Sequence, residues 1–284
     1  MKQKSRVCVS GSHGLIGSKL CEVLKADGIP REYLYDPAKL NKFIKGYDTV
    51  IHCGSYGNHH WQKDLAMVFV SNVFATENLL EACRMGGVKN FVYMGSSSEY
   101  GDKEVPMLEE MMPETYSMYG CCKVAGTYLT RHYSSYFNTV TVRPFSVYGE
   151  REDPGMFIPT LVRCIRDKDV FVMWRGNHDW VYIDDFARAI QIILFNIETI
   201  NGLIINVGSG MNLTNEEVVG TMILLTGKDL SIQRTGEGNP LWVADSSKIR
   251  SLGWKPKVCL YDGLKNVYQF ITNNERKTTK ERND

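Results

Sequence analysis

The chain has 284 residues, of which 43% are hydrophobic and 23% are charged, as is usual for a globular protein. Its 33 Lys and Arg residues nearly balance its 32 Asp and Glu residues, so the net charge of +1 gives no sign of a concentrated basic surface for nucleic acid or membrane. The densest apolar run, 189–195, is too short to cross a bilayer, and the eight Cys residues form no Cys-x-x-Cys pair. We therefore expect a soluble cytoplasmic protein with no metal site, and neither nucleic acid nor a membrane as partner.

Strand and helix patterns alternate along the first half of the chain. Apolar runs predict strands over 6–10, 49–52, 90–94 and 139–143, and apolar residues at helical spacing predict helices over 15–25, 68–85 and 116–136. Such alternation indicates an α/β fold, a Rossmann-type doubly wound parallel sheet with helices on both faces. We assign residues 1–150 to this domain.

The pattern loosens after residue 150. Helices are predicted over 158–166, 185–195 and 215–225, and a strand over 203–207. Thr214-Asn-Glu-Glu217 is a capping box that marks the start of the last of these helices. We expect residues 151–273 to form mainly a small C-terminal substrate lobe, with some segments returning to the sheet. The polar stretch 274–284 is expected to lack regular structure.

A glycine-rich loop, Gly11-Ser-His-Gly14-Leu-Ile-Gly17, follows the first predicted strand and opens the first helix. Gly11 permits a tight turn, Gly14 lets the backbone approach a pyrophosphate, and Gly17 allows close packing of helix and strand. The helix N-terminus would offer free N–H groups and a partial positive charge to the phosphates. The loop therefore predicts dinucleotide binding. The predicted contacts also include His13, Leu15 and Ile16.

An acidic residue about 20 positions after such a loop binds the adenine ribose in dinucleotide-binding folds. Asp36 stands at that distance. A carboxylate there accepts bonds from two hydroxyls and repels a 2′-phosphate, so it favours NAD over NADP, although NADP remains possible. Asp36 is equally suited to cap a helix that starts at Pro37.

A tyrosine and a lysine, Tyr119 and Lys123, lie one helical turn apart within a predicted helix. A free tyrosine has a pKa near 10, but a neighbouring ammonium group and a cationic nicotinamide both favour the phenolate. Tyr119 could then take a proton from a sugar hydroxyl while hydride leaves the same carbon. Ser96, at the end of the strand predicted over 90–94, would bind the reacting oxygen. Lys123 would also hold the nicotinamide ribose.

From residue 6 to about residue 271 the sequence resembles the extended short-chain dehydrogenases of the NAD-dependent epimerase/dehydratase family. The motifs that carry this resemblance are Gly11-x-x-Gly14-x-x-Gly17, Val50-Ile51-His52, Asn72, 95–101 (GSSSEYG), Tyr119-x-x-x-Lys123, 142–149 (VRPFSVYG), 179–185 (DWVYIDD), 206–210 (NVGSG) and Leu252-Gly-Trp254. The resemblance implies that the enzyme acts on a nucleotide-diphosphate sugar and forms a homodimer through a four-helix contact.

The resemblance also implies roles for individual residues. Ser96, Tyr119 and Lys123 would be catalytic. The cofactor would be lined by Cys53, Gly54, Ser55, Asn72 and Phe145. The substrate would contact Ser97, Ser98, Ser146, His178 and, through its phosphate, Arg234.

Four departures from the family pattern limit the reactions that the enzyme is expected to catalyse. The segment between Asp27 and Thr49 is short, so one strand of the nucleotide-binding half is expected to be missing. Ser97-Ser98 replaces the Asp-Glu pair of sugar dehydratases, and Met156 replaces the His of fucose synthases. Finally, His178 stands where the family often has Arg.

The reaction these departures favour is an NAD-dependent nucleotide-sugar epimerisation through a transient 4-keto sugar. An NADPH-dependent 4-keto-sugar reductase is the alternative. A regulator without catalysis is disfavoured, because Ser96, Tyr119 and Lys123 are all present. We expect His52 to be a satisfied strand-end histidine and Trp242 to belong to the core or the lobe.

Overall fold

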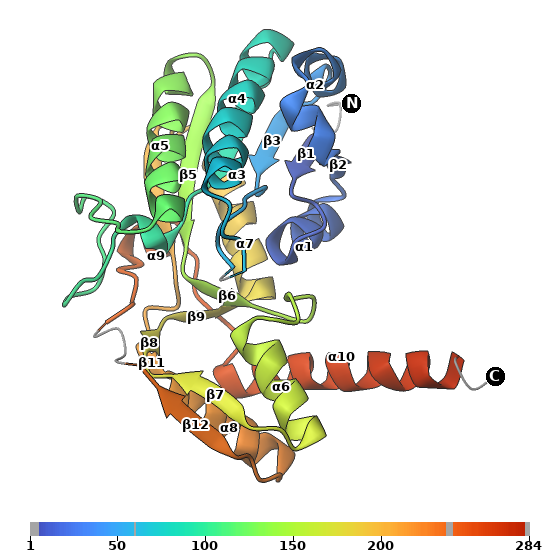
Figure 1. Ribbon diagram of the computed structural model, residues 1–284. Coiled ribbons are helices and arrows are strands. Elements are labelled where there is room, and N and C mark those ends of the chain that lie inside the picture. The colour runs from blue at the N-terminus through green and yellow to red at the C-terminus, as the bar shows by residue number, and fades with distance from the viewer. Residues whose placement is uncertain (1–5, 60, 237–240, 282–284) are drawn as a thin grey trace.

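The protein is described here from a computed structural model covering residues 6–59, 61–236 and 241–281. Within these residues a six-stranded parallel sheet has the order β10-β5-β4-β3-β1-β2 (Figure 1). Its strands are β1 Val7–Ser10, β2 Asp27–Ile29, β3 Thr49–His52, β4 Asn90–Met94, β5 Asn138–Pro144 and β10 Leu203–Val207. The chain crosses from one side of β1 to the other between β2 and β3, and such a switch point opens a crevice at the carboxyl ends of the strands.

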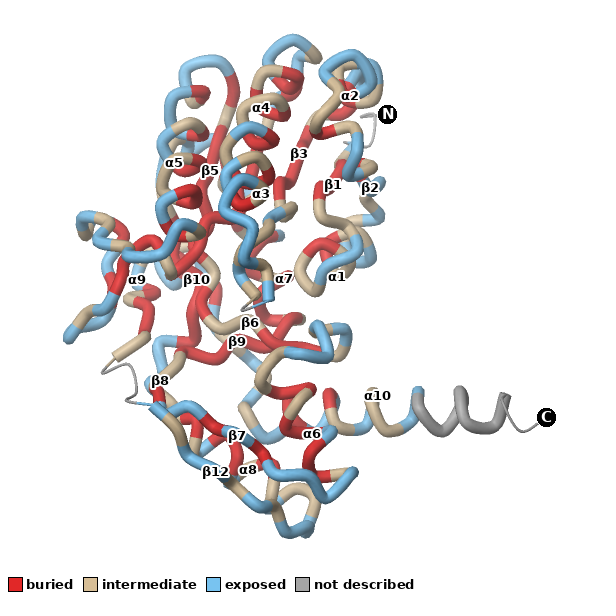
Figure 2. The backbone as a smooth tube through the Cα atoms, in the orientation of Figure 1, coloured by how far each residue is buried: buried red, intermediate tan, exposed pale blue. Residues whose placement is uncertain are grey.

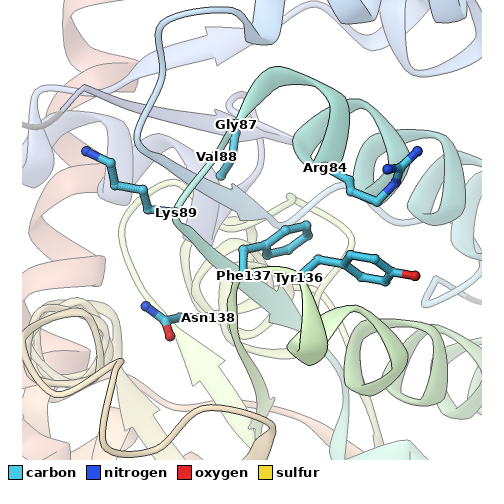
Figure 3. Close-up of a pocket in the computed structure, with 7 residues that line it drawn as sticks. All are labelled: Arg84, Gly87, Val88, Lys89, Tyr136, Phe137 and Asn138. Atoms are coloured by element: carbon cyan, nitrogen blue, oxygen red, sulfur yellow. The ribbon is translucent and has the colours of Figure 1, made fainter.

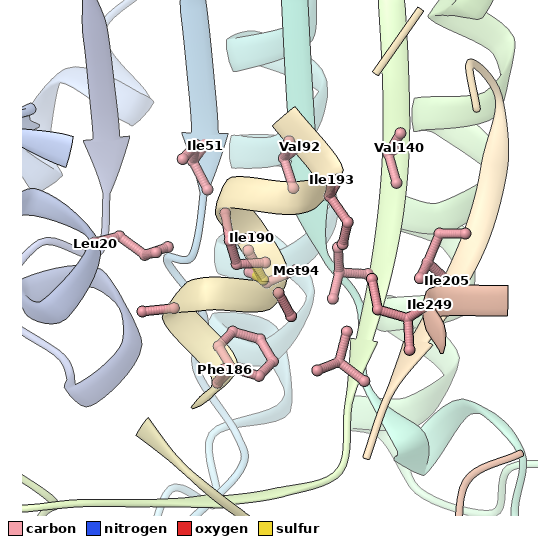
Figure 4. Close-up of a cluster of buried hydrophobic side chains, with 14 of the residues drawn as sticks. Leu20, Ile51, Val92, Met94, Val140, Phe186, Ile190, Ile193, Ile205 and Ile249 are labelled. Carbon is pink, nitrogen blue, oxygen red and sulfur yellow. The ribbon is translucent and has the colours of Figure 1, made fainter. Parts of the chain in front are cut away.

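Helices cover both faces of this sheet. One face carries α1 Leu15–Leu24 and α7 Ile183–Phe195, and the other carries α2 Pro37–Ile44, α4 Ala75–Gly86 and α5 Met118–His132. The strands alternate accordingly, since successive side chains point to opposite faces. Val92 of β4 packs in the first cluster with Ile190 of α7 (Figure 4), whereas Phe91 packs in the second with Leu79 of α4.

The helix predicted over 68–85 has a defect in its middle. It consists of α3 Leu65–Phe69, a π-helical turn η2 Val70–Phe74, and α4, joined without a break. A π turn widens the helix by one residue and often marks a functional site. Here it buries the polar side chains of Ser71 and Asn72.

The lobe lies beyond the carboxyl ends of the strands (Figure 1). Its own core joins α6, α8 and α10 to three short two-stranded ladders, β6–β9, β7–β12 and β8–β11. The elements of this half are β6 Ser146–Tyr148, α6 Phe157–Asp167, β7 Phe171–Trp174, β8 Asn177–His178, β9 Trp180–Tyr182, β11 Leu213–Thr214, α8 Asn215–Thr226, β12 Ile232–Thr235, α9 Ser247–Ser251 and α10 Leu260–Glu281. Short 3-10 turns complete the chain at η1 Arg31–Tyr35, η3 Ser97–Glu99 and η4 Tyr133–Ser135.

The predicted α/β architecture is confirmed, and the capping box at Thr214 and Glu217 forms both of its hydrogen bonds. A single strand, β2, lies outside β1 among the described residues, so the expected loss of one strand is borne out. The expectation for 274–284 is wrong for most of that stretch, because α10 continues to Glu281. The stretch contains no Gly or Pro, and it extends a helix already nucleated on the lobe. Figure 2 shows the buried residues of the described part of α10 where the helix crosses the lobe.

In the described part of the chain, no helix combines the length and the apolar character needed to cross a bilayer.

Candidate active site

The glycine loop has the geometry that a pyrophosphate needs. Gly11 has φ +68°, and a Cβ there would lie 2.7 Å from the backbone nitrogen of Gly54. A Cβ at Gly17 would lie 2.1 Å from the carbonyl oxygen of Gly11, so these two glycines are required by packing. At Gly14, by contrast, the nearest described atom would be 3.5 Å away. The loop is therefore open at Gly14, beside an α1 N-terminus that has neither a side-chain cap nor an acidic residue among its described first-turn residues.

A buried hydrogen-bond chain supports the turn beside this loop. Thr76 donates its hydroxyl proton to the carbonyl oxygen of Asn72 over 2.7 Å, so its oxygen accepts from His52 Nε2 at 3.0 Å. The other ring nitrogen, Nδ1, is then an acceptor for the Ser10 hydroxyl at 2.5 Å, and Ser10 Oγ accepts from Gly54 N–H at 3.1 Å. This order requires a neutral imidazole, and burial lowers the pKa of His52 to about 3. His52 is thus a satisfied histidine that fixes the turn at 53–55.

Asn72 acts on the same turn. Its amide nitrogen donates to the carbonyl oxygens of Tyr56 at 2.6 Å and Val68 at 2.7 Å, and its oxygen accepts from Tyr56 N–H at 3.4 Å. Both amide protons are therefore engaged with backbone. Asn72 therefore ties the turn after β3 to the π-helical segment. Its amide N–H groups are occupied by these contacts, so direct contact with a cofactor stays a prediction.

The structure brings the three predicted catalytic residues together. Ser96 follows β4, Tyr119 lies in the first turn of α5, and Lys123 lies one turn later on the same face. The Tyr119 hydroxyl faces the side chains of Ser96 and Ser55, and hydrogen bonding to either of them lowers its pKa. Lys123 is 2% exposed, donates to the carbonyl oxygen of Met94 at 2.8 Å, and lies 5.7 Å from the centre of the Tyr119 ring.

Burial is the largest influence on the pKa values of Tyr119 and Lys123. It raises the pKa of Tyr119 to about 12, against the lowering effect of the hydrogen bonds to Ser96 and Ser55. Burial also lowers the pKa of Lys123 to about 8, so its ammonium form is only moderately favoured at neutral pH. A phenol in this state keeps its proton at neutral pH, and it needs added positive charge nearby before the phenolate, the form that can accept a proton, becomes accessible.

Ser97 and Ser98, which follow Ser96, have different hydrogen-bond partners. Ser97 is buried, and its hydroxyl accepts a 3.0 Å hydrogen bond from Trp242 Nε1, 145 residues later in the chain. Trp242 therefore belongs to a lobe segment that reaches back to the catalytic turn. Ser98 is partly exposed and donates its backbone N–H to Ser96 Oγ at 3.1 Å. Ser97 thus anchors the lobe, and Ser98 remains a candidate for substrate contact.

Three other predicted residues meet at the junction between body and lobe. Phe145 is buried against Tyr100, directly after β5. Ser146 on β6 and His178 on β8 approach to 3.3 Å between Oγ and Nδ1. Burial lowers the pKa of His178, which leaves the ring neutral at pH 7. This pair can offer one hydroxyl and one imidazole to a polar ligand.

Two predicted residues stand apart from this cluster. Asp36 lies seven residues beyond the end of β2, and its carboxylate caps α2 through Lys39 N–H at 3.1 Å and pairs with Lys39 Nζ at 3.0 Å. Its helix-capping interpretation is thus observed, while its contact with the ribose stays a prediction. Arg234 is half-exposed on β12 and faces Glu216 at 3.9 Å.

A second surface depression lies away from the candidate catalytic residues. A depression of about 540 Å³ is lined by Arg84, Lys89, Tyr136, Phe137 and Asn138 (Figure 3). Lys89 precedes β4 and Asn138 begins β5, so this depression lies at the amino-terminal edge of the sheet. The glycine loop and the catalytic residues lie at the opposite edge. The described residues contain no group of three or more His, Cys, Asp or Glu that could hold a metal ion.

The model of the NAD dependent epimerase/dehydratase family matches residues 7–208. The chain belongs to this family. An uncharacterized UDP-glucose epimerase of Bacillus subtilis is 28% identical over 316 residues, covering 94% of this chain and 98% of that protein. A dTDP-glucose 4,6-dehydratase of Streptomyces griseus is 29% identical over 237 residues, covering 78% of this chain and 71% of the relative.

Solved structures give the same result for this epimerase/dehydratase family member. The UDP-glucuronic acid 4-epimerase of Bacillus cereus, in complex with UDP-glucuronic acid and NAD, matches with a TM-score of 0.86 and 27% identity over 95% of this chain and 99% of that one. The prediction of an NAD-dependent enzyme of the extended short-chain dehydrogenase type is confirmed. It is related to nucleotide-sugar epimerases and dehydratases.

Proposed function

We propose that this family member is an NAD-dependent nucleotide-sugar 4-epimerase that works through a transient 4-keto sugar. The observation that carries the proposal is the grouping of Ser96 and Tyr119 beside Lys123, without a carboxylate at the two positions after Ser96. A dehydratase needs an acid and a base there. Here Ser97 is instead engaged by Trp242.

Bound NAD supplies the hydride acceptor and donor for this chemistry. Ser96 would bind the oxygen on C4, and Tyr119 would remove its proton. Because the pKa of Tyr119 is raised to about 12 by burial, the positive charges of Lys123 and the oxidised nicotinamide are what make the phenolate accessible. The keto-sugar would rotate within the site so that its opposite face meets the cofactor, and Tyr119 would then return the proton to the same oxygen.

The lobe would hold the rest of the substrate. Ser98, Ser146 and His178 would contact the sugar, and Arg234 would contact the diphosphate. The weak 3.9 Å ion pair of Arg234 with Glu216 leaves its guanidinium able to exchange partners.

The test is an incubation of purified protein with UDP-, GDP- and dTDP-hexoses without added cofactor, followed by NMR of the sugars. Conversion of one 4-epimer into the other supports the proposal, and the Tyr119→Phe variant should slow this conversion by about 10²–10⁴-fold. Stoichiometric oxidation of NADPH with a 4-keto-6-deoxy sugar nucleotide, in the absence of epimerisation, would replace it with the reductase alternative.

We also propose that the enzyme is a homodimer formed through α3–α4 and α5. These helices pack together on one face of the sheet (Figure 1) and expose large apolar side chains, with Leu65 61%, Phe69 48% and Tyr128 58% exposed. A dimer would cover them. Light scattering should give a dimer mass that Phe69→Glu and Tyr128→Glu reduce to the monomer. Phe195→Glu, at a 90% exposed position on α7, is the matched control and should not change the mass.

A further inference from the structure

One acidic side chain lies wholly buried behind the catalytic residues. Glu99 is 0% exposed, and its partner Arg143 is 1% exposed. Arg143 Nε and Nη2 donate to Glu99 Oε2 at 3.0 and 2.8 Å. Two charges taken out of water pay a large desolvation cost, and apolar residues of similar volume would often be as stable. A buried pair of this kind is therefore weak as a stabilising device.

The remaining bonds of Glu99 connect it to the catalytic elements. Its Oε1 accepts the backbone N–H of Ser96 at 2.9 Å, and its Oε2 also accepts the Thr127 hydroxyl at 2.9 Å. Thr127 follows Lys123 by four residues on α5, and Lys123 follows Tyr119 by four, so all three share one face of the helix. One carboxylate thus joins the turn of Ser96 to the helix of the other two catalytic residues.

Glu99 also lies in the electrostatic surroundings of Lys123. The Glu99–Thr127 bond holds the carboxylate against the face of α5 that also carries Lys123, one helical turn before Thr127. Burial lowers the pKa of Lys123, and among the described residues Glu99 is the carboxylate that raises it again. The titratable groups that face Lys123 from the elements packed around it are His52 at the end of β3, Cys53 directly after it, Tyr93 on β4, Glu99 on η3, and Tyr119 and Cys122 on α5.

We propose that Glu99 is a positioning residue that sets Ser96 against Tyr119 and keeps Lys123 in its ammonium form. Arg143 holds Glu99 in place through two hydrogen bonds, and Thr127 transmits its position to α5. The part of this inference that concerns turnover rests on the proposed function, and the part that concerns the charge of Lys123 does not.

The positional part is tested with Thr127→Val and Thr127→Ser. Val removes the hydroxyl that binds Glu99 and keeps the volume, so kcat should fall at least about tenfold, the effect of a distorted catalytic geometry, with KM little changed. Ser restores the hydroxyl and should restore kcat. Equal rates for Val, Ser and the parent enzyme would overturn the positional role.

The charge part is tested without turnover, from the urea midpoint between pH 6 and 10. Lys123 has a pKa of about 8 in the folded protein and about 10.5 when unfolded, so between these values the unfolded chain holds the extra proton and the contribution of Lys123 to stability rises with pH. The buried thiols of Cys8, Cys53 and Cys83, whose pKa values burial raises, lower stability over the same range, so the rise is measured as the difference between the parent and Lys123→Met. Glu99→Gln should move the onset of this rise down by about one pH unit or more, the usual effect of one nearby charge. A Lys123→Met background should remove both the rise and the shift.

Two variants keep this test decisive. If Glu99→Gln does not fold because Arg143 is left unpaired, the double variant Glu99→Gln/Arg143→Gln removes both charges and should still shift the onset. Glu109→Gln is the control, since Glu109 is also buried, accepts a backbone N–H at 2.9 Å from Asn206 and pairs with Lys248. It should lower stability without moving the onset.

The charge role of Glu99 and the proposed epimerisation can be refuted independently of each other. An unmoved onset in the Glu99 variants, with the Lys123→Met background behaving as expected, overturns the charge role whatever the enzyme catalyses. A shifted onset in a protein that epimerises no sugar leaves the charge role standing and rejects the proposed reaction.

Discussion

Alanine should have opposite effects at Gly14 and Gly17, although both belong to one loop. A Cβ at Gly17 would lie 2.1 Å from the Gly11 carbonyl oxygen and 2.7 Å from its carbon, and both are backbone atoms at the β1–α1 junction. No rotamer relieves that overlap, so Gly17→Ala should cost about 1–3 kcal/mol of unfolding free energy. At Gly14 a Cβ lies 3.5 Å from the same oxygen, and φ −77° with ψ 169° suits any residue. Gly14→Ala should therefore leave the folded protein as stable as the parent.

Binding should show the reverse pattern. The space beside Gly14 is what a pyrophosphate would fill, so Gly14→Ala should weaken NAD binding by about 100-fold, equivalent to ~2.7 kcal/mol. Urea unfolding gives the first quantity, and fluorescence titration with NADH gives the second. A Gly14→Ala protein that binds NADH as tightly as the parent would refute the placement of the cofactor. A Gly17→Ala protein of unchanged stability would refute the packing argument.

Three further outcomes are expected. Tyr119→Phe should lower kcat by about 10²–10⁴-fold while folding and NAD binding persist, Ser96→Ala should cost less, and an unimpaired Tyr119→Phe enzyme would exclude the mechanism. Asp36→Ala should weaken NAD more than NADP in parallel titrations if its carboxylate reaches the ribose, and equal losses would make it a helix cap only. Because the pKa of His52 is lowered to about 3, the unfolded chain takes up a proton below pH 6.5 that the folded one refuses. Stability should then fall with decreasing pH by up to about 1.4 kcal/mol per unit between pH 6.5 and 3. His52→Gln should flatten that slope in acid unfolding curves, and an identical slope in the variant would contradict this assignment.

The grouping of the three candidate catalytic residues was predictable because its signals are local. Tyr119 and Lys123 are one turn apart on one helix, and Ser96 ends a strand with a clear apolar pattern, Phe91 to Met94. Parallel strands bring their carboxyl ends to one edge, so the sequence order alone places these groups near the glycine loop.

Other features depend on partners distant in sequence. Nothing near Glu99 indicates Arg143, 44 residues later, and nothing near Ser97 indicates Trp242. Strand β2 escaped prediction because Asp27-Gly28-Ile29 is three residues long and begins with a pair typical of turns. A mid-strand arginine such as Arg143 was the one available sign of a buried anion, since an unpaired charge there would be prohibitive.

The position of β10 in the sheet determines which fragments of the chain could fold and when folding could finish during synthesis. β10 pairs with β5 only after the chain has passed through α6 and α7, and α7 covers the sheet face that holds Val92 and Val140. A fragment ending at residue 150 would leave β5 as a bare edge and that apolar face uncovered, a strong template for aggregation. The boundary at 150 therefore separates two roles but not two folding units. During synthesis the nucleotide-binding half could not complete its sheet until residue 207 has left the ribosome. Until then, chaperones or slow collapse of the chain would have to protect its apolar face.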